Sequence, residues 1–520
     1  MPGSDPTNFD QPAERGALRT GVETLVIFLI FCMSACWAIP EPNESHYVSK
    51  ARHYWNHEWL AGDFFLNSPD WHTTFNLTTG WLTRFLDMPD VVRLGRVLTW
   101  TLMAFFWGRL SWAIIPISGA SIVSAALVVA LNERLQLAGE WFIGGFEAKG
   151  FAYALVLGAL AELARGRWNR TWLLLGGATA FHVLVGGWAA MAVGASWIFS
   201  GAGRPSVRAM APGLVGFAVL ATPIVVQSLS LTRGVDAATL ATANDIYVFR
   251  RVPHHLFVFS MKPEFQWRFA GLVAAFAVMT WFTPASAGSR RVRVCVWASL
   301  AMAAVGVALG ALALSQPELA ARWLRFYWFR LTDVFVPLGV SLTATQLAYQ
   351  AAASYPRTRM LAPAALFLIG CGMLVLRPET PLSSSTPRAD KPSKTANLPD
   401  WRDACAWIVE NTPVDSRFIT PRQSQTFRWY AGRSEVATLK DMPQDAPNLV
   451  EWWNRIEDLH GSTDPERRWH KSLTELDPAR LQELGAKYNA QFLLTEAEPA
   501  LELPCVYRNQ SYAVYQIAKP

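Results

Sequence analysis

The sequence predicts a mainly α-helical fold, in which a polytopic bundle of about eleven transmembrane helices precedes a C-terminal soluble α/β region. Three observations predict it. Hydrophobic residues make up 52% of the 520-residue chain, and charged residues make up only 17%. Apolar runs of roughly 17–25 residues, the length that crosses a bilayer, recur between residues 24 and 376. After residue 376, charges recur every few residues, as in a fold exposed to water.

The apolar runs define the individual spans. The short pair 171–186 and 187–200 leaves open a broken or re-entrant hairpin in place of two crossings. Basic residues precede the first apolar run, as they precede the apolar region of a signal peptide. The many spans that follow favour a retained first helix instead. The predicted spans are 22–40, 94–113, 114–132, 149–165, 171–186, 187–200, 209–230, 266–284, 294–314, 325–350 and 360–376.

Charge predicts the orientation of these spans. The first 376 positions carry a net +8, and the remaining residues, with 18 Lys and Arg against 20 Asp and Glu, carry −2. Short Arg-rich connections face the cytoplasm in membrane proteins, so we expect a cytoplasmic N-terminus and an extracytoplasmic C-terminus in the cell's inner membrane. A basic excess confined to the membrane half is a topology signal, and we expect no nucleic-acid partner. The Arg residues concerned are Arg15, Arg19, Arg109, Arg165, Arg167, Arg170, Arg204, Arg208, Arg290, Arg291, Arg293, Arg357 and Arg359.

The chain divides into three predicted segments: a multi-span transmembrane domain over 1–376, a Pro- and Ser-rich linker over 377–398, and an extracytoplasmic α/β domain over 399–520. In the last segment, helical and strand patterns alternate, which is typical of an open sheet. It carries no nucleophile elbow, phosphate-binding loop or metal-ligand spacing, so we expect it to cap the membrane domain or to bind a substrate or partner. Whether Cys405 and Cys505 pair is left open.

The predicted outer loops 41–93, 133–148 and 231–265 gather carboxylates from two loops and Arg and His pairs from a third. Carboxylates can deprotonate a hydroxyl or hold a divalent metal. Arg and His suit a phosphate leaving group. A base opposite a phosphate clamp, at a lipid–water boundary, suits group transfer from a lipid-phosphate carrier. The candidates are Glu44, His46, Tyr47, Asp63, Glu147, Lys149, Arg250, Arg251, His254, His255 and Arg325, with His182 inside the fifth span as a further ligand contact.

Two short motifs resemble the GT-C superfamily of polytopic glycosyltransferases, which use polyprenyl-phosphate sugars. NESHY (43–47) is similar to the acidic signature that follows the first helix there, and GDFF (62–65) resembles the motif after it. The resemblance implies that Glu44 is the catalytic base, and its placement suggests a second role for Asp63. It also implies a membrane lipid and a polyprenyl-phosphate-linked sugar as partners. Many members carry an Asp where this chain has Asn43, so a metal such as Mg²⁺ or Mn²⁺ is left undecided.

Longer stretches, GEWFIGGFEAKGFAYAL and AFHVLVGGWA, also resemble an uncharacterised group of bacterial membrane proteins. Two other functions therefore stay open: a transporter or flippase for a lipid-linked or anionic solute, and a non-enzymatic assembly or sensor protein. Transporter sites lie near the bilayer midplane on related half-repeats, whereas these ionisable residues cluster at span ends. With Glu44 as the base, the transferase hypothesis predicts that Glu44 and the basic residues 250–255 face one cavity. The donor sugar, the acceptor and the oligomeric state are left open.

Overall fold

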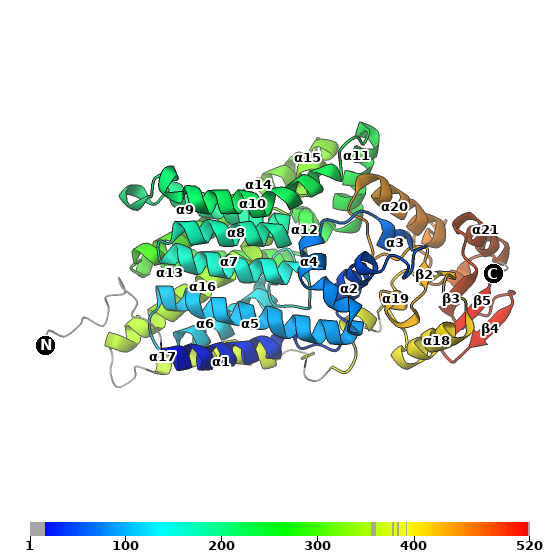
Figure 1. Ribbon diagram of the computed structural model, residues 1–520, viewed down its shortest axis with the longest axis horizontal. Coiled ribbons are helices and arrows are strands. Elements are labelled where there is room, and N and C mark those ends of the chain that lie inside the picture. Colours follow the sequence, from blue (N-terminus) through cyan, green and yellow to red (C-terminus); the bar gives the residue numbers. More distant parts are fainter. Residues whose placement is uncertain (1–15, 355–359, 377–378, 382–383, 392, 518–520) are drawn as a thin grey trace.

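The computed structural model describes residues 16–354, 360–376, 379–381, 384–391 and 393–517. Long helices lie side by side in a bundle, and a smaller α/β region covers one end of it (Figure 1). Arg15, Arg357 and Arg359 of the predicted cytoplasmic series lie outside the described residues, as do five positions of the predicted linker.

Eleven helices form the bundle in the described part of the chain; each overlaps one predicted span, except that α9 overlaps both spans of the short pair and α5 reaches the first residue of the next span. Five of them (α1, α10, α13, α14 and α16) are both long and apolar enough to cross a membrane, and α9 and α17 are apolar but shorter. The predicted polytopic helix bundle is therefore confirmed. The helices are α1 Ala17–Ala35, α5 Met88–Ile114, α6 Ala120–Leu135, α7 Ala148–Ala164, α8 Trp168–Phe181, α9 Val183–Ile198, α10 Val207–Ser230, α13 Pro263–Phe282, α14 Ala287–Leu312, α16 Arg330–Ser354 and α17 Leu361–Val375.

The short pair of predicted spans is resolved as two helices, α8 and α9, that meet at His182. The backbone of His182 is extended, and its Nδ1 accepts a hydrogen bond from the Val185 N–H at 3.4 Å, which caps α9. The helices then pack closely, because a Cβ on Gly186 would lie 2.2 Å from the backbone nitrogen of Thr179. The sequence break at His182 thus marks a tight helical turn, which brings this imidazole to the end of the bundle.

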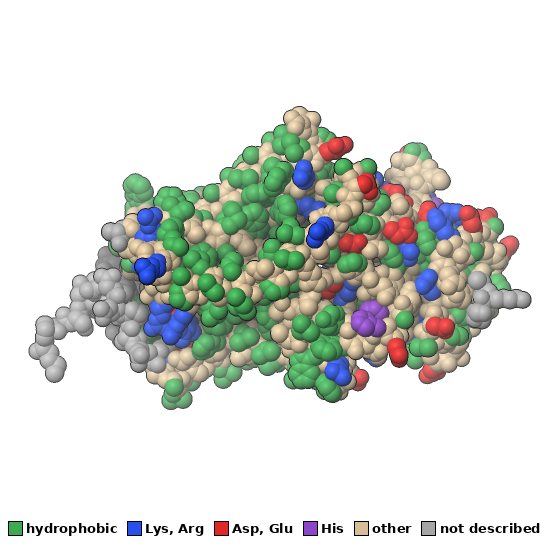
Figure 2. Space-filling model, turned by 45° about the horizontal axis from the view of Figure 1, so that its top comes forward, with side chains coloured by type: hydrophobic (Ala, Val, Ile, Leu, Met, Phe, Trp, Pro, Cys, Tyr) green, Lys and Arg blue, Asp and Glu red, His purple; other side chains and the backbone are tan. Residues whose placement is uncertain are grey.

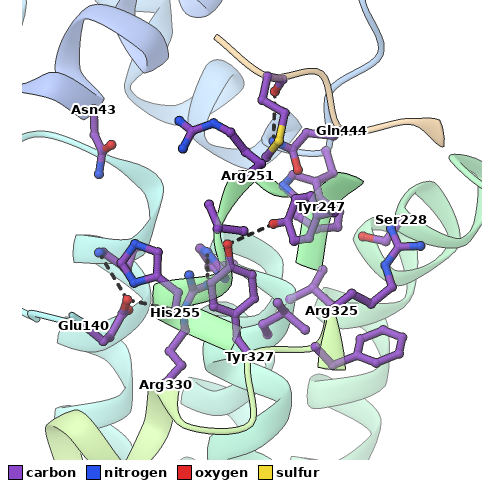
Figure 3. A pocket seen from close by; sticks show the side chains of 18 of the residues that line it. Asn43, Glu140, Ser228, Tyr247, Arg251, His255, Arg325, Tyr327, Arg330 and Gln444 are labelled. Carbon is purple, nitrogen blue, oxygen red and sulfur yellow. Dashed lines mark hydrogen bonds and ion pairs between the residues drawn. The ribbon is translucent and has the colours of Figure 1, made fainter. Parts of the chain in front are cut away.

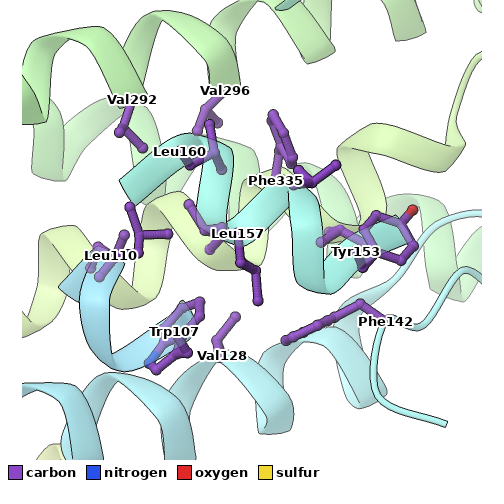
Figure 4. Close-up of a cluster of buried hydrophobic side chains, with 14 of the residues drawn as sticks. Trp107, Leu110, Val128, Phe142, Tyr153, Leu157, Leu160, Val292, Val296 and Phe335 are labelled. Carbon is purple, nitrogen blue, oxygen red and sulfur yellow. The ribbon is translucent and has the colours of Figure 1, made fainter. Parts of the chain in front are cut away.

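The core of the bundle lies where α5, α6, α7, α14 and α16 converge (Figure 4). Trp107, Val128, Leu157, Val296 and Phe335 come from these five helices in turn, and each is almost completely buried. Lipid tails are as apolar as these side chains, so close packing rather than water exclusion holds such a core together. The apolar residues that remain exposed cover the outer helices, and Figure 2 shows them along the length of the bundle.

Short helices and turns fill the end of the bundle next to the α/β region (Figure 1), whereas the Arg-rich segments 165–170, where α7 gives way to α8, and 290–293, near the start of α14, lie at the opposite end. The loops predicted to share one face therefore lie together at the same end. The elements there are α2 Pro42–Trp55, α3 Phe64–Asn67, α4 Thr73–Thr78, η1 Gly80–Arg84, α11 Ala237–Asp245, the π-helical turn η3 Ile246–Arg251, α12 Pro253–Leu256, η4 Val258–Ser260 and α15 Pro317–Leu324; η2 Gly201–Gly203 lies in the α9–α10 connection.

The C-terminal region is a small sheet between two helical layers. The strand order is β2-β1-β3-β5-β4; β1 is parallel to β2 and β3, and β5 is antiparallel to β3 and β4. Side chains alternate across a strand: Phe418 faces Trp401 of α18, and Ile419 faces the layer with Trp452 of α20. The elements are η5 Arg388–Asp390, α18 Leu398–Asn411, β1 Arg417–Ile419, α19 Phe427–Ala431, β2 Ser434–Glu435, α20 Ala446–His460, η6 Leu473–Glu475, α21 Pro478–Tyr488, β3 Phe492–Glu496, β4 Cys505–Arg508 and β5 Tyr512–Gln516.

The two cysteines of this region do not pair. Cys405 is buried on α18 among the apolar side chains of one layer, whereas Cys505 is exposed on the edge strand β4, and both thiols are free.

One buried arginine joins the C-terminal region to the first long connection. The Arg428 guanidinium lies 3.1 Å from both oxygens of Asp63 and 3.1 Å from Glu435 Oε1, and it also pairs with Asp441. Asp63 in turn caps α3 through the Leu66 N–H at 2.9 Å. All four side chains are buried. The cluster therefore fixes the α/β region to the first long connection, and so to the helix bundle.

Arg428→Met should strongly destabilise the protein, because it leaves three buried carboxylates without their cation. Removing one partner of a buried ion pair costs about 3–5 kcal/mol. Thermal unfolding of the purified full-length protein measures the loss. Arg480→Met is the matched control, since Arg480 is partly exposed and pairs with Glu483 on the surface, where such pairs contribute about 0–1 kcal/mol. Equal stability of the two variants would contradict a role for Arg428 in holding the regions together.

Candidate functional site

A cavity of about 1230 Å³ opens at the covered end of the bundle (Figure 3). Its walls come from the start of α2, the connection 138–147, the α8–α9 turn, the end of α10, α11, η3, α12, α15 and the start of α16. We call the residues that the C-terminal region contributes the roof: Lys394, Gln425, Lys440, Met442 and Gln444. Segments far apart in the sequence thus line one cavity, whose size suits a ligand larger than a single sugar.

Cations outnumber carboxylates in this cavity. Seven Lys and Arg residues line it against four Glu residues, and His46, His72, His182, His254 and His255 line it as well. A low-dielectric pocket with excess positive charge attracts anions. The cations are Lys149, Arg251, Arg322, Arg325, Arg330, Lys394 and Lys440, and the carboxylates are Glu41, Glu140, Glu147 and Glu318.

Two carboxylates share one lysine on the cavity wall. Lys149 Nζ lies 3.6 Å from Glu140 Oε2 and 3.4 Å from Glu147 Oε1. Glu140 is held further by Arg330 Nε at 3.3 Å and by the Tyr153 hydroxyl at 3.2 Å. From the described residues, the Glu147 carboxylate accepts one further hydrogen bond, from the Asn43 amide at 2.7 Å. Glu140 is therefore a counter-charge for its cations, whereas Glu147 keeps acceptor capacity toward the cavity.

Buried backbone contacts hold this wall in place. Asp333 accepts hydrogen bonds from the backbone N–H groups of Leu137, Ala138 and Glu140 at 2.7, 2.8 and 3.0 Å. A charge-assisted set of this kind fixes a loop more firmly than neutral bonds do. Asp333 lies one helical turn after Arg330 on α16. The same helix therefore fixes the connection 137–140 and directs the Arg330 guanidinium toward Glu140 (Figure 3).

Two tyrosines stand in the middle of the cavity (Figure 3). The Tyr327 and Tyr247 hydroxyls are 2.9 Å apart, and the Arg330 guanidinium lies 3.9 Å from the centre of the Tyr327 ring. Tyr327 has φ +57°, a left-handed conformation that costs about 1–3 kcal/mol in a residue with a Cβ. Such strain gathers at functional sites, and here it places a phenol between the two ends of the cavity.

The cavity has an apolar side. Leu229 at the end of α10, Leu319 and Trp323 on α15, and Phe326 just after α15 all line it while remaining exposed, Leu229 by 66% and Trp323 by 48%. Arg322 and Arg325 belong to the same segment. We call these six residues the rim. A rim that joins apolar side chains to cations suits a ligand with an apolar tail and an anionic head.

Most of the predicted binding residues line this one cavity. His46, Tyr47, Glu147, Lys149, His182, Arg251, His254, His255 and Arg325 are brought together there. Arg250 is not, because its guanidinium pairs with Asp245 at 2.7 Å on the exposed face of the π-helical turn. Arg325 Nη1 donates to Asn244 Oδ1 at 2.8 Å. Burial lowers the pKa of His255 to about 3, so this imidazole is neutral in the cavity.

Glu44, the predicted base, lies behind the cavity wall and not in the cavity. Its carboxylate accepts four hydrogen bonds: two from Arg96 at 2.6 and 2.7 Å, one from the Phe146 N–H at 2.8 Å and one from the Glu41 N–H at 2.7 Å. Four bonds use the acceptor capacity of a carboxylate, and Glu44 is fully buried. A Cβ on Gly145 would lie 2.7 Å from Glu44 Oε1. This placement suits anchoring the corner and does not suit proton transfer to a substrate.

Asp63 also lies apart from the cavity, because Arg428 and the cap of α3 use its oxygens. The two residues predicted to be catalytic therefore face buried arginines. The acids of the motifs at 43–47 and 62–65 anchor the backbone around the cavity. Two neighbours of Glu44, Glu41 and Asn43, do line the cavity. Burial raises the pKa of Glu41 to about 7, an effect that the Arg388 guanidinium opposes.

Several cavity residues carry no motif in the sequence. Arg330 is an ionisable group in an apolar helix, where such groups are costly and often functional. Lys440 and Lys394 gave no signal, because only the folding of the C-terminal region over the bundle brings them to the cavity. Among the described residues, no three His, Cys, Asp or Glu side chains gather to hold a metal ion. The cavity carboxylates Glu140 and Glu147 are already paired with Lys149, so this donor set does not fit a divalent cation.

These features define a class: a multi-span helical membrane protein with an anion-attracting cavity between its bundle and an α/β roof. Among solved structures, the chain is similar to ArnT from Cupriavidus metallidurans bound to undecaprenyl phosphate, with 14% identity, a TM-score of 0.51, and coverage of 97% of this chain and 98% of that chain. The likeness shows that this chain shares the overall fold of that protein, and the predicted architecture of a polytopic helix bundle followed by an α/β region is thereby confirmed.

Three further comparisons were made. An oligosaccharyltransferase from Archaeoglobus fulgidus, in complex with Zn and sulfate, matches at 13% identity and a TM-score of 0.42, covering 92% of this chain and 67% of that one. A family model described as a domain of unknown function, DUF6798, matches residues 399–459, which include the roof residues of the β2–α20 connection. A search of curated proteins found no match.

Glu44→Gln should destabilise the folded protein, because it removes the charge that compensates Arg96 in a buried pair. We expect a loss of about 3–5 kcal/mol, measured by thermal unfolding of the purified protein. Glu264→Gln, at the exposed start of α13, is the matched control and should leave stability within about 0.5 kcal/mol. A stable Glu44→Gln protein that has lost only its activity would contradict the anchoring role.

Proposed function

We propose that this protein is a membrane glycosyltransferase that moves a sugar from a polyprenyl-phosphate carrier to an acceptor in the cavity. One observation carries the proposal: the rim joins exposed apolar side chains to Arg322 and Arg325, and Glu147 lies deeper in the same space. The fold adds support, since the ArnT neighbour is bound to undecaprenyl phosphate. In the proposed arrangement, the polyprenyl chain lies against the apolar rim and its phosphate faces the two arginines.

The proposed reaction is an inverting displacement. Glu147 takes the proton of an acceptor hydroxyl, whose oxygen bonds to the anomeric carbon while the bond from that carbon to the carrier phosphate oxygen breaks. The electron pair stays on the phosphate, which becomes a monoester. Lys149 Nζ pairs with Glu147 Oε1 at 3.4 Å, and the Asn43 amide orients its carboxylate. Arg325 and Arg322 stabilise the charge that develops on the phosphate, where preorganised donors are most effective.

Glu44 and Asp63 take positioning roles in this proposal. Glu44 fixes the start of α2 and the backbone at Phe146, which carry Asn43 and Glu147 respectively. Asp63 holds the C-terminal region through Arg428. His46, Tyr47 and His182 line the part of the cavity near Asn43 and suit contacts with sugar hydroxyls. No step is assigned to a metal ion.

Glu147→Gln should abolish most transfer, because an amide cannot accept the proton, and loss of a general base costs about 10²–10⁴-fold in rate. The measurement is transfer of radiolabelled sugar from a polyprenyl-phosphate donor pool by membranes that contain the variant. Binding of undecaprenyl phosphate to the purified variant should persist, since the rim is unchanged. Glu264→Gln is the control with normal transfer. Full transfer by Glu147→Gln would overturn the assigned base, and lipid movement without a covalent product would favour a flippase.

The orientation belongs to the same proposal: the Arg-rich end faces the cytoplasm, and the cavity and C-terminal region face outward. Two natural cysteines test it, because Cys36 and Cys505 are exposed near the covered end. A membrane-impermeant maleimide applied to intact cells, whose outer membrane is made permeable where one is present, should label Cys36→Ser through Cys505. The Cys36→Ser, Cys505→Ser double variant is the control without label. Labelling that requires lysis of the inner membrane would reverse the orientation.

A further inference from the structure

Three cations at the roof end of the cavity have no carboxylate partner. Lys440 Nζ donates to Asn43 Oδ1 at 2.6 Å, Lys394 Nζ to the Arg388 carbonyl at 3.1 Å, and Arg251 Nε to the Leu439 carbonyl at 2.9 Å. Within the described ranges, no Asp or Glu oxygen lies within 4.0 Å of these three charged groups. The site therefore holds positive charge without a direct ion pair; carboxylates act on it only at longer range, Glu147 on Lys440, and Asp390 and Glu41 on Lys394.

These cations are partly buried and have no ion-pair partner among the described residues, an arrangement that disfavours their charged forms, and the pKa values of the two lysines reflect it. Burial, together with the nearby Arg251, lowers the pKa of Lys440 to about 7. Burial likewise lowers the pKa of Lys394 to about 8. Proteins retain such groups where a ligand supplies the missing charge. An anion placed between these side chains would restore their full protonation and recover the cost of their burial.

Hydrogen bonds and ion pairs fix the loop that carries Lys440. The Trp452 indole N–H donates to the Thr438 carbonyl at 2.9 Å, and the Leu439 N–H donates to the Arg422 carbonyl at 2.9 Å. Asp441, the next residue, pairs with His46 at 3.0 Å and with the buried Arg428. Lys440 is thus fixed on both sides, so its ammonium is held over the cavity before any ligand arrives, which lowers the entropic cost of binding.

This end of the cavity is distinct from the rim. In Figure 3, Asn43, which accepts the hydrogen bond from Lys440, lies on the side of Glu140, whereas Arg325 lies beside Ser228 on the opposite side, with Tyr247 and Tyr327 between them. A sugar-phosphate diester carries one negative charge. If that charge lies at Arg322 and Arg325, the roof cations remain uncompensated, and a second anion is needed.

We propose that Lys440 and Lys394, with Arg251 facing them, form a second anion subsite that binds an oxyanion, a phosphate or a carboxylate, on the acceptor. The term acceptor rests on the proposed function; the subsite itself rests on the three cations. The acceptor is then an acidic molecule, whose anionic group is held by the C-terminal region while a hydroxyl reaches Glu147. This gives the matched region 399–459 a direct part in substrate recognition.

The test is calorimetric titration of the full-length protein in nanodiscs of neutral phosphatidylcholine. Inorganic phosphate and acetate are titrated separately, each with and without saturating undecaprenyl phosphate. We expect phosphate or acetate to bind with the lipid already present, and the better of the two to identify the acidic group. Lys440→Gln should weaken that binding at least about tenfold, as expected for a lost charge-assisted contact. Lys394→Gln serves as a second variant, and exposed Lys471→Gln serves as the unchanged control.

Arg325→Gln separates the two hypotheses, because it should weaken lipid binding and leave oxyanion binding unchanged. The subsite is overturned if neither anion binds, if undecaprenyl phosphate displaces the anion competitively, or if both Lys440→Gln and Lys394→Gln bind as the unaltered protein does. Binding of oxyanion that depends on Lys440, in a protein that does not bind undecaprenyl phosphate, would support the subsite and reject the carrier proposed above.

Discussion

One buried ion pair, between Glu44 of α2 and Arg96 of α5, fixes the geometry on which the cavity depends. Besides binding Glu44, Arg96 donates to the Trp37 carbonyl at 2.5 Å, just after α1. Glu44 binds the N–H groups of Glu41 and Phe146. The pair therefore joins the end of α1, the start of α2, α5 and the connection before α7. Glu41, Asn43 and Glu147 reach the cavity from backbone that this pair holds.

Buried charged groups fix the other walls of the cavity in the same way. Asp333 ties the connection 137–140 to α16, and Arg428 ties the C-terminal region to Asp63. Each is a buried charge with a nearly complete set of partners, which is the condition under which burial of charge becomes tolerable. Such clusters contribute little net stability compared with apolar packing, but they allow few alternative arrangements. A cavity formed by segments from both ends of a 520-residue chain needs that restriction more than it needs extra stability.

Much of the fold could be predicted from the sequence, because a membrane span is a local pattern. In the described part of the chain, the eleven predicted apolar runs correspond to eleven helices, and the Arg-rich segments 165–170 and 290–293 lie together at one end. The α/β character of the C-terminal region followed from local periodicity in the same way. The site was harder, because it depends on which way single side chains point. Arg250 and Arg251 are adjacent, yet the π-helical turn sends one to the surface and the other to the cavity.

Glu44 shows the limit most clearly. A conspicuous acid after the first helix has the same sequence appearance whether it reacts with a substrate or anchors a corner, and only its four hydrogen bonds distinguish the two. Lys440 shows the opposite case: it follows a short strand in a charged region, some 400 residues from the Asn43 that it contacts. No local pattern signals a contact of that kind, and only the packing of the C-terminal region against the bundle creates it.

The charge distribution of the cavity agrees with the direction of the proposed reaction. Before transfer, one negative charge lies on Glu147 and one on the carrier phosphodiester. After transfer, Glu147 is neutral and the phosphate monoester carries two. The reaction thus moves negative charge from the Lys149 wall to the rim, where Arg322 and Arg325 have no carboxylate partner among the described residues. These cations interact most strongly with the phosphate as it departs and gains charge. They therefore stabilise the transition state more than the bound substrate, which is the condition for catalysis. Roof cations that hold an acidic acceptor do not change charge state in this step, so they suit binding and orientation.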